Sequence, residues 1–322
     1  MPTVDVHHHI LPEFFWRETN EQHGPVGGIA PPPWSAESAL AFMDDAGIDI
    51  AVTSISTPGV HTGNDRRARS LARRCNELAA GLVQARPDRF GGFACLPLPD
   101  IDGSLAELTH AFDVLKLDGV VLFSNARGVY LGDEKFDRIF EELERRRAVV
   151  FVHPTASPDR SAHALGLPDS LLDFVADTSR AIAHLHYSNT FARTPNVKFI
   201  FSHAGGTIPY LATRFAIVDQ MGVIEGAGER GTASETFRRL YWDTALSWSD
   251  PVLGLLRSVV GMDQILYGSD FPYLRRDLAI GSRRHLAETE ALTQTERVAV
   301  LGKSAMKLLP RIDERRRTRG ES

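Results

Sequence analysis

Eight short runs of apolar, β-branched residues, each followed by a segment with helical spacing, constrain the fold of this 322-residue chain more than any other feature. The runs are 4–10, 48–55, 92–98, 119–123, 149–153, 197–203, 241–246 and 265–270. Near-continuous apolar strands separated by helices are typical of a parallel sheet buried on both faces. Eight such units favour a single (β/α)8 TIM barrel over a doubly wound sheet, because no glycine-rich phosphate loop follows the first run.

The domain organisation follows from this count of units. We expect one barrel domain over residues 1–310, and we expect the basic residues of 311–322 to form a solvated C-terminal tail. Residues 14–35 and 154–169 are longer than the units require, and both segments follow a strand. They should therefore cover the C-terminal face of the barrel, where loops form the active site in this fold.

Composition excludes several classes of function. A formal net charge of −5 gives no electrostatic case for nucleic acid or for an anionic membrane surface as a partner. No run approaches the roughly 18 apolar residues of a membrane span. Cys75 and Cys95 are too few for a disulfide framework, so we expect a protein of the reducing cytoplasm.

Histidine is the unusual residue type, with 12 copies, three of them consecutive at positions 7 to 9. Because side chains alternate along a strand, Asp5, His7 and His9 should share one face of the first strand and His8 the other. Val4 and Val6 lie on the face opposite His7 and His9, and apolar side chains on that face would pack against the surrounding helices. We therefore expect His7 and His9 to face the barrel interior and His8 to face the helices.

Three further polar residues end later strands. His153 ends the fifth run, His203 the sixth and Asp270 the eighth. A single strand-end histidine is commonly a structural hydrogen-bonding residue, but strand ends converge at the mouth of a barrel. Three imidazoles and one carboxylate, from His7, His9, His153 and Asp270, suit a divalent metal such as zinc.

The motifs around these residues resemble the amidohydrolase superfamily, in its branch of aminocarboxymuconate-semialdehyde decarboxylase-like proteins. The matching motifs are Asp5-Val6-His7-His8-His9-Ile10-Leu11-Pro12, Phe151-Val152-His153-Pro154, Ser202-His203-Ala204-Gly205-Gly206 and Gly268-Ser269-Asp270-Phe271-Pro272. The resemblance extends from the first strand to about residue 309. Residues 136–155 and 177–214 are most similar to the 6-methylsalicylate decarboxylase type.

The resemblance implies a metal held by His7, His9, His153 and Asp270, with His203 as a nearby acid/base residue. It also implies a homodimer, since members of this branch are commonly dimers. Binuclear members of the superfamily carry a carboxylated lysine at the end of strand four, where this chain has Phe123-Ser124-Asn125. One divalent ion is therefore expected, Zn²⁺ in the first place and Mn²⁺ as the alternative, with no organic cofactor.

Two reactions fit such a centre. The first, which the resemblance implies, is metal-dependent, non-oxidative decarboxylation of a small-molecule carboxylate. This substrate is a small aromatic acid, such as an ortho-hydroxybenzoate, or an unsaturated acid, with Asp270 or His203 as proton donor. The alternative is hydrolysis of a lactone, ester or amide, with His203 activating a metal-bound water.

One arginine and three loop residues are further candidates for the functional site. Arg214 falls among the apolar positions of a helix, and a buried guanidinium requires an anionic partner. That partner is either an internal carboxylate or the substrate carboxylate. The resemblance implies the second role, because decarboxylases of this branch use an arginine at this spacing after the strand-six histidine. His61, Asn125 and Arg127 lie in loops on the functional face and are most simply solvated loop residues.

Overall fold

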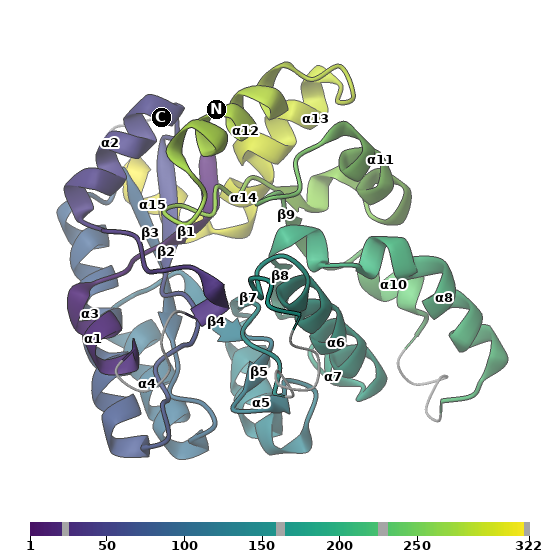
Figure 1. Ribbon diagram of the computed structural model, residues 1–322, viewed down its shortest axis with the longest axis horizontal. Coiled ribbons are helices and arrows are strands. Elements are labelled where there is room, and N and C mark those ends of the chain that lie inside the picture. The colour runs from purple at the N-terminus through teal and green to yellow at the C-terminus, as the bar shows by residue number, and fades with distance from the viewer. Residues whose placement is uncertain (21–25, 159–164, 225–230, 319–322) are drawn as a thin grey trace.

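Eight parallel strands form the centre of the structure, a computed structural model that describes residues 1–20, 26–158, 165–224 and 231–318 (Figure 1). Each predicted run overlaps one strand, which confirms the barrel. The strand order is β1 (Val4–His9), β2 (Ile50–Ser54), β3 (Phe90–Cys95), β4 (Gly119–Phe123), β7 (Val149–His153), β8 (Lys198–Phe201), β9 (Tyr241–Asp243) and β10 (Ile265–Leu266).

The barrel closes between its first and last strands. The Val6 amide donates to the carbonyl of Tyr267 at 3.0 Å, and the Asp270 amide donates to the carbonyl of His7 at 3.0 Å. His8 and Phe271 form a parallel β-bridge. The first strand and the segment after the last strand are thus joined directly beneath the mouth.

Helices surround the strands on the outside of the barrel (Figure 1). The longer ones are α2 (Ala36–Ala46), α3 (Asp65–Ala85), α4 (Ile101–Asp113), α5 (Asp137–Arg146), α6 (Asp173–Tyr187), α8 (Ile208–Met221), α11 (Asp250–Val259) and α12 (Arg276–Glu288). The shorter ones are α1 (Glu13–Asn20), α7 (Thr190–Arg193), α10 (Ala233–Phe237), α13 (Gln294–Val298), α14 (Ser304–Leu308) and α15 (Pro310–Arg317). Each of the amphipathic helices buries one face: α5 buries Ile139, Phe140 and Leu143, at the spacing that predicts a helix.

Aromatic side chains fill the barrel interior below the mouth. Phe93 stacks on Phe151 with ring centroids 5.7 Å apart, and the His7 ring lies 5.0 Å from Phe151. All three side chains are almost fully buried. His7 therefore packs against buried aromatic side chains below it, and its imidazole lies toward the mouth of the barrel.

The C-terminal segment differs from the expected solvated tail. Residues 310–317 form α15, in which Ile312 is fully buried. Arg315 pairs with Asp118 through two hydrogen bonds of 3.0 and 2.9 Å, and Arg311 donates to the carbonyl of Leu117. The basic composition suggested solvation, but these arginines satisfy acceptors beside the start of β4. The helix covers the N-terminal face of the barrel; residues 319–322 lie outside the described part.

The two long segments meet over the mouth, as expected from their positions after strands. The backbone of Gly28 lies very close to Pro168. A Cβ atom added to Gly28 would lie only 2.9 Å from the Cα atom of Pro168. Gly28 has a φ of 78°, so both its conformation and its neighbour require glycine there. Residues 21–25 and 159–164 of these segments lie outside the described part. None of the helices in the described ranges is long and apolar enough to cross a membrane.

Candidate metal centre

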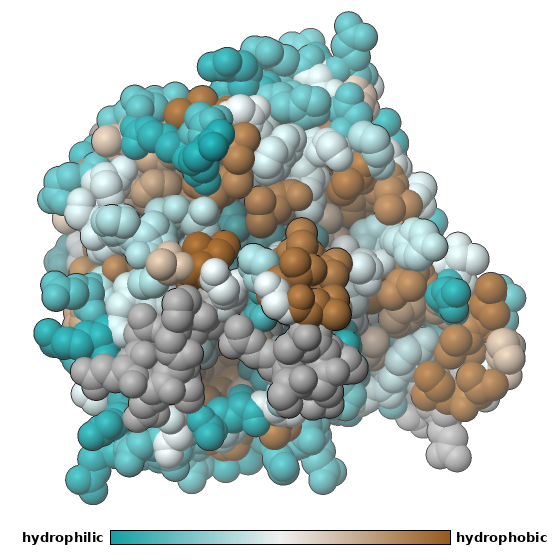
Figure 2. Space-filling view, in the orientation of Figure 1, coloured by the Kyte–Doolittle hydropathy of each residue, from teal (hydrophilic) through white to brown (hydrophobic). Residues whose placement is uncertain are grey.

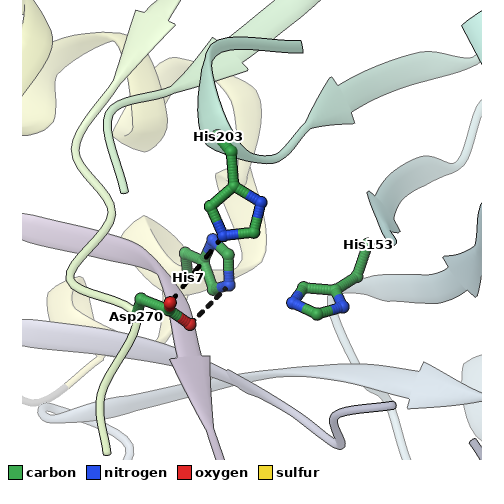
Figure 3. Close-up of side chains that lie close together, drawn as sticks. All are labelled: His7, His153, His203 and Asp270. Atoms are coloured by element: carbon green, nitrogen blue, oxygen red, sulfur yellow. Dashed lines mark ion pairs between the residues drawn. The ribbon is translucent and has the colours of Figure 1, made fainter. Parts of the chain in front are cut away.

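Four buried side chains from separate strand ends converge at the barrel mouth (Figure 3). His7 comes from β1, His153 ends β7, His203 lies just after β8, and Asp270 follows β10. One ligand atom from each lies within 4.8 Å of the others. The Asp270 carboxylate is 3.2 Å from His7 Nε2 and 3.7 Å from His203 Nε2.

His9 belongs to the same cluster. Its Nε2 lies 3.0 Å from His7 Nε2 and 3.3 Å from an Asp270 oxygen. The structure therefore brings together all four predicted ligands, His7, His9, His153 and Asp270, and places His203 beside them. His203 is close enough to be a fifth ligand or an acid/base residue.

Hydrogen bonds on the far side of the rings orient the imidazoles. His7 Nδ1 lies 2.7 Å from Asp243 Oδ2, and His153 Nδ1 lies 2.8 Å from the carbonyl oxygen of Pro154. A proton on Nδ1 satisfies each of these acceptors, which leaves the Nε2 lone pair directed at the cluster. This is the arrangement that metal-ligating histidines adopt, and neutral imidazoles with one carboxylate form a donor set that fits zinc or manganese.

The electrostatics of the cluster favour a cation. Burial opposes a charge on His7, but Asp243 and Asp270 outweigh it and raise the His7 pKa to about 10. Burial lowers the pKa of His9 and, together with the neighbouring imidazoles, holds that of His153 well below its usual range. Burial alone would raise the pKa of Asp270, but His7 and the hydrogen-bonding histidines hold it well below its ordinary value. In the absence of an ion, a proton on His7 therefore balances the Asp270 carboxylate, and a bound cation would replace that proton.

Asp243 connects two parts of the centre. Its Oδ2 accepts from His7, while its Oδ1 accepts from the amides of His203 at 2.8 Å and Ala245 at 3.0 Å. His203 has a φ of 53° and Asp270 a φ of 57°, both in the left-handed region that most side chains avoid. Such strain is retained where surrounding hydrogen bonds impose it, and here it aims both side chains at the cluster.

The predicted alternation along β1 is only partly correct. His7 and His9 face the metal cluster, and His8 points outward, where its ring stacks on Phe271 at 4.6 Å. Asp5, however, does not share the face of His7: its carboxylate lies 3.0 Å from His8 Nδ1. The pairing of β1 with β2 shifts by one residue between Asp5 and His8, and such a bulge breaks the two-residue period.

A cavity of about 520 Å³ opens onto the cluster and is lined by His153, His203 and Asp270. Its remaining described walls are mostly apolar: Gly27, Ile29, Ser56, Thr57, Pro168, Ser170, Leu171, Phe174, Val175, Leu246, Ser247, Tyr273 and Leu274. A cavity of this size and character accepts a single substituted ring. The sequence did not indicate Phe174, Leu246 or Tyr273, because they come from helices and loops without a motif.

The remaining sequence candidates lie elsewhere. Arg214 is exposed on α8 and is not among the residues that line this cavity, so the expectation of a buried guanidinium is wrong. The helix is covered on one side only, and Arg214 faces solvent. His61, Asn125 and Arg127 line a second cavity beside the first.

The fold and the donor set define a (β/α)8 barrel with a buried metal-binding centre at its C-terminal face. The family model described as amidohydrolase matches residues 4–311, and the chain belongs to this family.

Known relatives support this assignment. The 6-methylsalicylic acid decarboxylase of Aspergillus aculeatus is 35% identical over 96% of this chain and 96% of its own. A crystal structure of an amidohydrolase II superposes with a TM-score of 0.90 at 29% identity, covering 96% of this chain and 99% of that one. The 5-carboxyvanillate decarboxylase of Novosphingobium aromaticivorans, solved with manganese and a nitrobenzoic acid, shares the fold with a TM-score of 0.85 at 22% identity, over 96% of each chain.

Proposed function

We propose that this protein is a metal-dependent, non-oxidative decarboxylase of a small aromatic acid of the ortho-hydroxybenzoate type. The observation that carries the proposal is the His and Asp cluster at the end of an apolar, ring-sized cavity. The similarity to a 6-methylsalicylic acid decarboxylase over nearly the whole chain supports the same reaction.

The cluster would hold one divalent ion through His7, His9, His153 and Asp270. When bound, the ion supplies a positive charge that binds and orients a phenolic oxygen and a carboxylate. The donor set fits zinc and manganese alike. Manganese is supported by its presence in a relative with the same fold, and zinc by the preference of imidazole-rich sites.

The residues of the chain then divide the remaining work. The apolar walls, among them Phe174 and Leu246, hold the ring and exclude water from it. A proton must be delivered to the ring carbon that bears the carboxylate; the bond to the carboxylate then breaks, CO₂ leaves, and its bonding electrons restore the aromatic ring. Asp270 and His203 both line the cavity and are the candidate proton donors.

Measuring CO₂ release tests this proposal directly. The metal-loaded enzyme is offered 6-methylsalicylate, 2,6-dihydroxybenzoate and salicylate, with a benzoate lacking the ortho hydroxyl as the control and a lactone as the rival substrate. We expect CO₂ and the corresponding phenol from an ortho-hydroxy acid only. Lactone opening without any decarboxylation would identify the hydrolase instead.

We further propose a homodimer in which Arg214 binds the substrate carboxylate. Tyr210, Arg214, Ile217 and Met221 recur at helical spacing on the outer face of α8 and are all exposed. Figure 2 shows hydrophobic surface, coloured brown, at the right edge of the molecule, where Figure 1 places α8. Because Arg214 does not line the cavity of its own chain, the role requires a second copy packed on this stripe.

We also propose that the protein is located in the cytoplasm. Cys75 and Cys95 are both free and buried. Unpaired thiols fit the reducing cytoplasm, where disulfides are rare.

A further inference from the structure

A second cavity of about 330 Å³ lies beside the candidate catalytic cavity on the same face of the barrel. Three loops enclose it, namely residues 58–62 after β2, residues 123–128 after β4, and residues 155–158 after β7. Its volume falls within the range of about 300–1,000 Å³ that is usual for small-molecule sites.

The two cavities are separate. No described residue lines both of them. Thr57, which lines the catalytic cavity, and Thr155, which lines the second one, are buried and hydrogen-bonded through their hydroxyls at 2.7 Å. This pair forms part of the wall, so a ligand in one cavity does not occupy the other.

The second cavity has an apolar floor and one charged group. Leu96, Leu98, Val121 and Leu122 form the buried floor. In the described part of its lining, Arg127 is the one side chain with a permanent charge. The Arg127 guanidinium makes no hydrogen bond or ion pair with the described part of the chain, so an acceptor on a ligand would find its donors free.

The imidazole of His61 does not supply a second charge. Its Nδ1 accepts from the Gly63 amide at 3.2 Å, so the ring proton is on Nε2, which lies 2.8 Å from Asp65 Oδ1. His61 is therefore engaged as a neutral ring. Asp65 is mostly exposed and is not among the lining residues.

A rigid turn presents Arg127. Strands β5 (Asn125–Ala126) and β6 (Val129–Tyr130) form a hairpin whose two central residues are Arg127 and Gly128, with φ values of 51° and 88°. Two-residue turns of this kind prefer asparagine followed by glycine, because both positions require a positive φ. An arginine at the first position is unfavourable for the turn, which indicates a role for its side chain.

Buried hydrogen bonds fix the hairpin in place. Asn125 accepts from the Gly128 amide at 3.0 Å and donates to Asp177 at 2.9 Å. The Tyr130 hydroxyl donates to the other oxygen of Asp177 at 2.5 Å. Asp177 is fully buried on α6, so the turn is anchored to the helix layer. The backbone that carries Arg127 is therefore held in place before a ligand binds.

We infer that this cavity is a second binding site, for a small monocarboxylate with an apolar body. The carboxylate pairs with Arg127, and the body packs on the leucine and valine floor. None of the described residues that line the catalytic cavity lines this site, and the inference does not depend on the proposed reaction.

Fluorine NMR of the metal-loaded enzyme with 4-fluorobenzoate as probe tests this inference without turnover. We expect a bound signal whose dissociation constant rises about tenfold or more in Arg127→Asn, since asparagine keeps the turn but removes the charge. Arg127→Lys keeps the charge but loses the planar guanidinium donors, so it should bind more weakly than wild type and more tightly than Arg127→Asn.

Two further variants distinguish the cavities. Ala126→Phe fills the second cavity from its rim and should abolish the same signal, while His153→Ala alters only the catalytic cavity and should leave it in place. Wild-type binding in both Arg127→Asn and Ala126→Phe, or loss of all bound signal in His153→Ala, would overturn the inference. A failed CO₂ assay would not affect it.

Discussion

At the scale of single residues, Asp270 is the one carboxylate in the cluster of imidazoles, and it is buried. Asp270→Asn keeps the size of the side chain but removes its charge. We expect bound metal and turnover to fall together by more than about 100-fold. Metal content by elemental analysis, measured beside activity, tests this, with the cavity-lining Ser247→Ala as a control that should retain the metal.

Asp243 acts through other residues. Asp243→Asn would present an amide to His7 Nδ1 and would weaken the acceptor of the His203 amide. We expect metal affinity to fall by about 10- to 100-fold, as for other groups that orient metal ligands. Titration with manganese, followed by its paramagnetic resonance signal, gives the affinity. An unchanged affinity would show that Asp243 does not orient His7.

The sequence predicted the positions of some site residues correctly and of others incorrectly. Strand-end position was enough to find His7, His9, His153, His203 and Asp270, because parallel strands bring their C-terminal ends together. The same reasoning failed for Asp5, since a bulge in β1 is invisible to a strict two-residue period. Helical periodicity likewise failed to predict that Arg214 is exposed. A helix packs on one side only, and the spacing of apolar residues does not determine whether a position at the edge of that side is buried.

At the scale of elements, α15 gives a clear test of the corrected C-terminus. Ile312→Ala should lower the free energy of unfolding by about 2–5 kcal/mol, because Ile312 is fully buried against the barrel. Chemical denaturation measures the change. The control, Arg317→Ala, alters an exposed side chain of the same helix and should cost less than about 0.5 kcal/mol. Equal stability of Ile312→Ala and wild type would mean that the segment is solvated after all.

The element boundaries show where sequence reasoning ends. Runs 119–123 and 149–153 match β4 and β7, whereas β10 covers only two residues of the run 265–270. The rest of that run bonds irregularly to β1, through the Val6 amide to the Tyr267 carbonyl and the Asp270 amide to the His7 carbonyl. The short β5–β6 hairpin was not predicted, since two-residue strands carry too little pattern.

At the scale of the whole molecule, the exposed stripe on α8 predicts the oligomeric state. Met221→Glu places a charge in the stripe and should convert a dimer of 35.5 kDa chains into monomers, as sedimentation would show. Arg66→Glu, an exposed change on α3, should not. If Arg214 acts in a second copy, the monomeric variant should also show a raised KM. A monomeric wild type would remove both parts of the proposal.

The closure of the barrel has a consequence for how this protein is made. His7 and His9 leave the ribosome first, but Asp270 follows about 260 residues later and joins them only when the last strand seals against the first. A nascent chain therefore exposes histidines without the carboxylate that completes the centre. Binding of the ion through all four ligands must await synthesis of the last strand, and the bound ion would in turn stabilise the contact between the first and last strands.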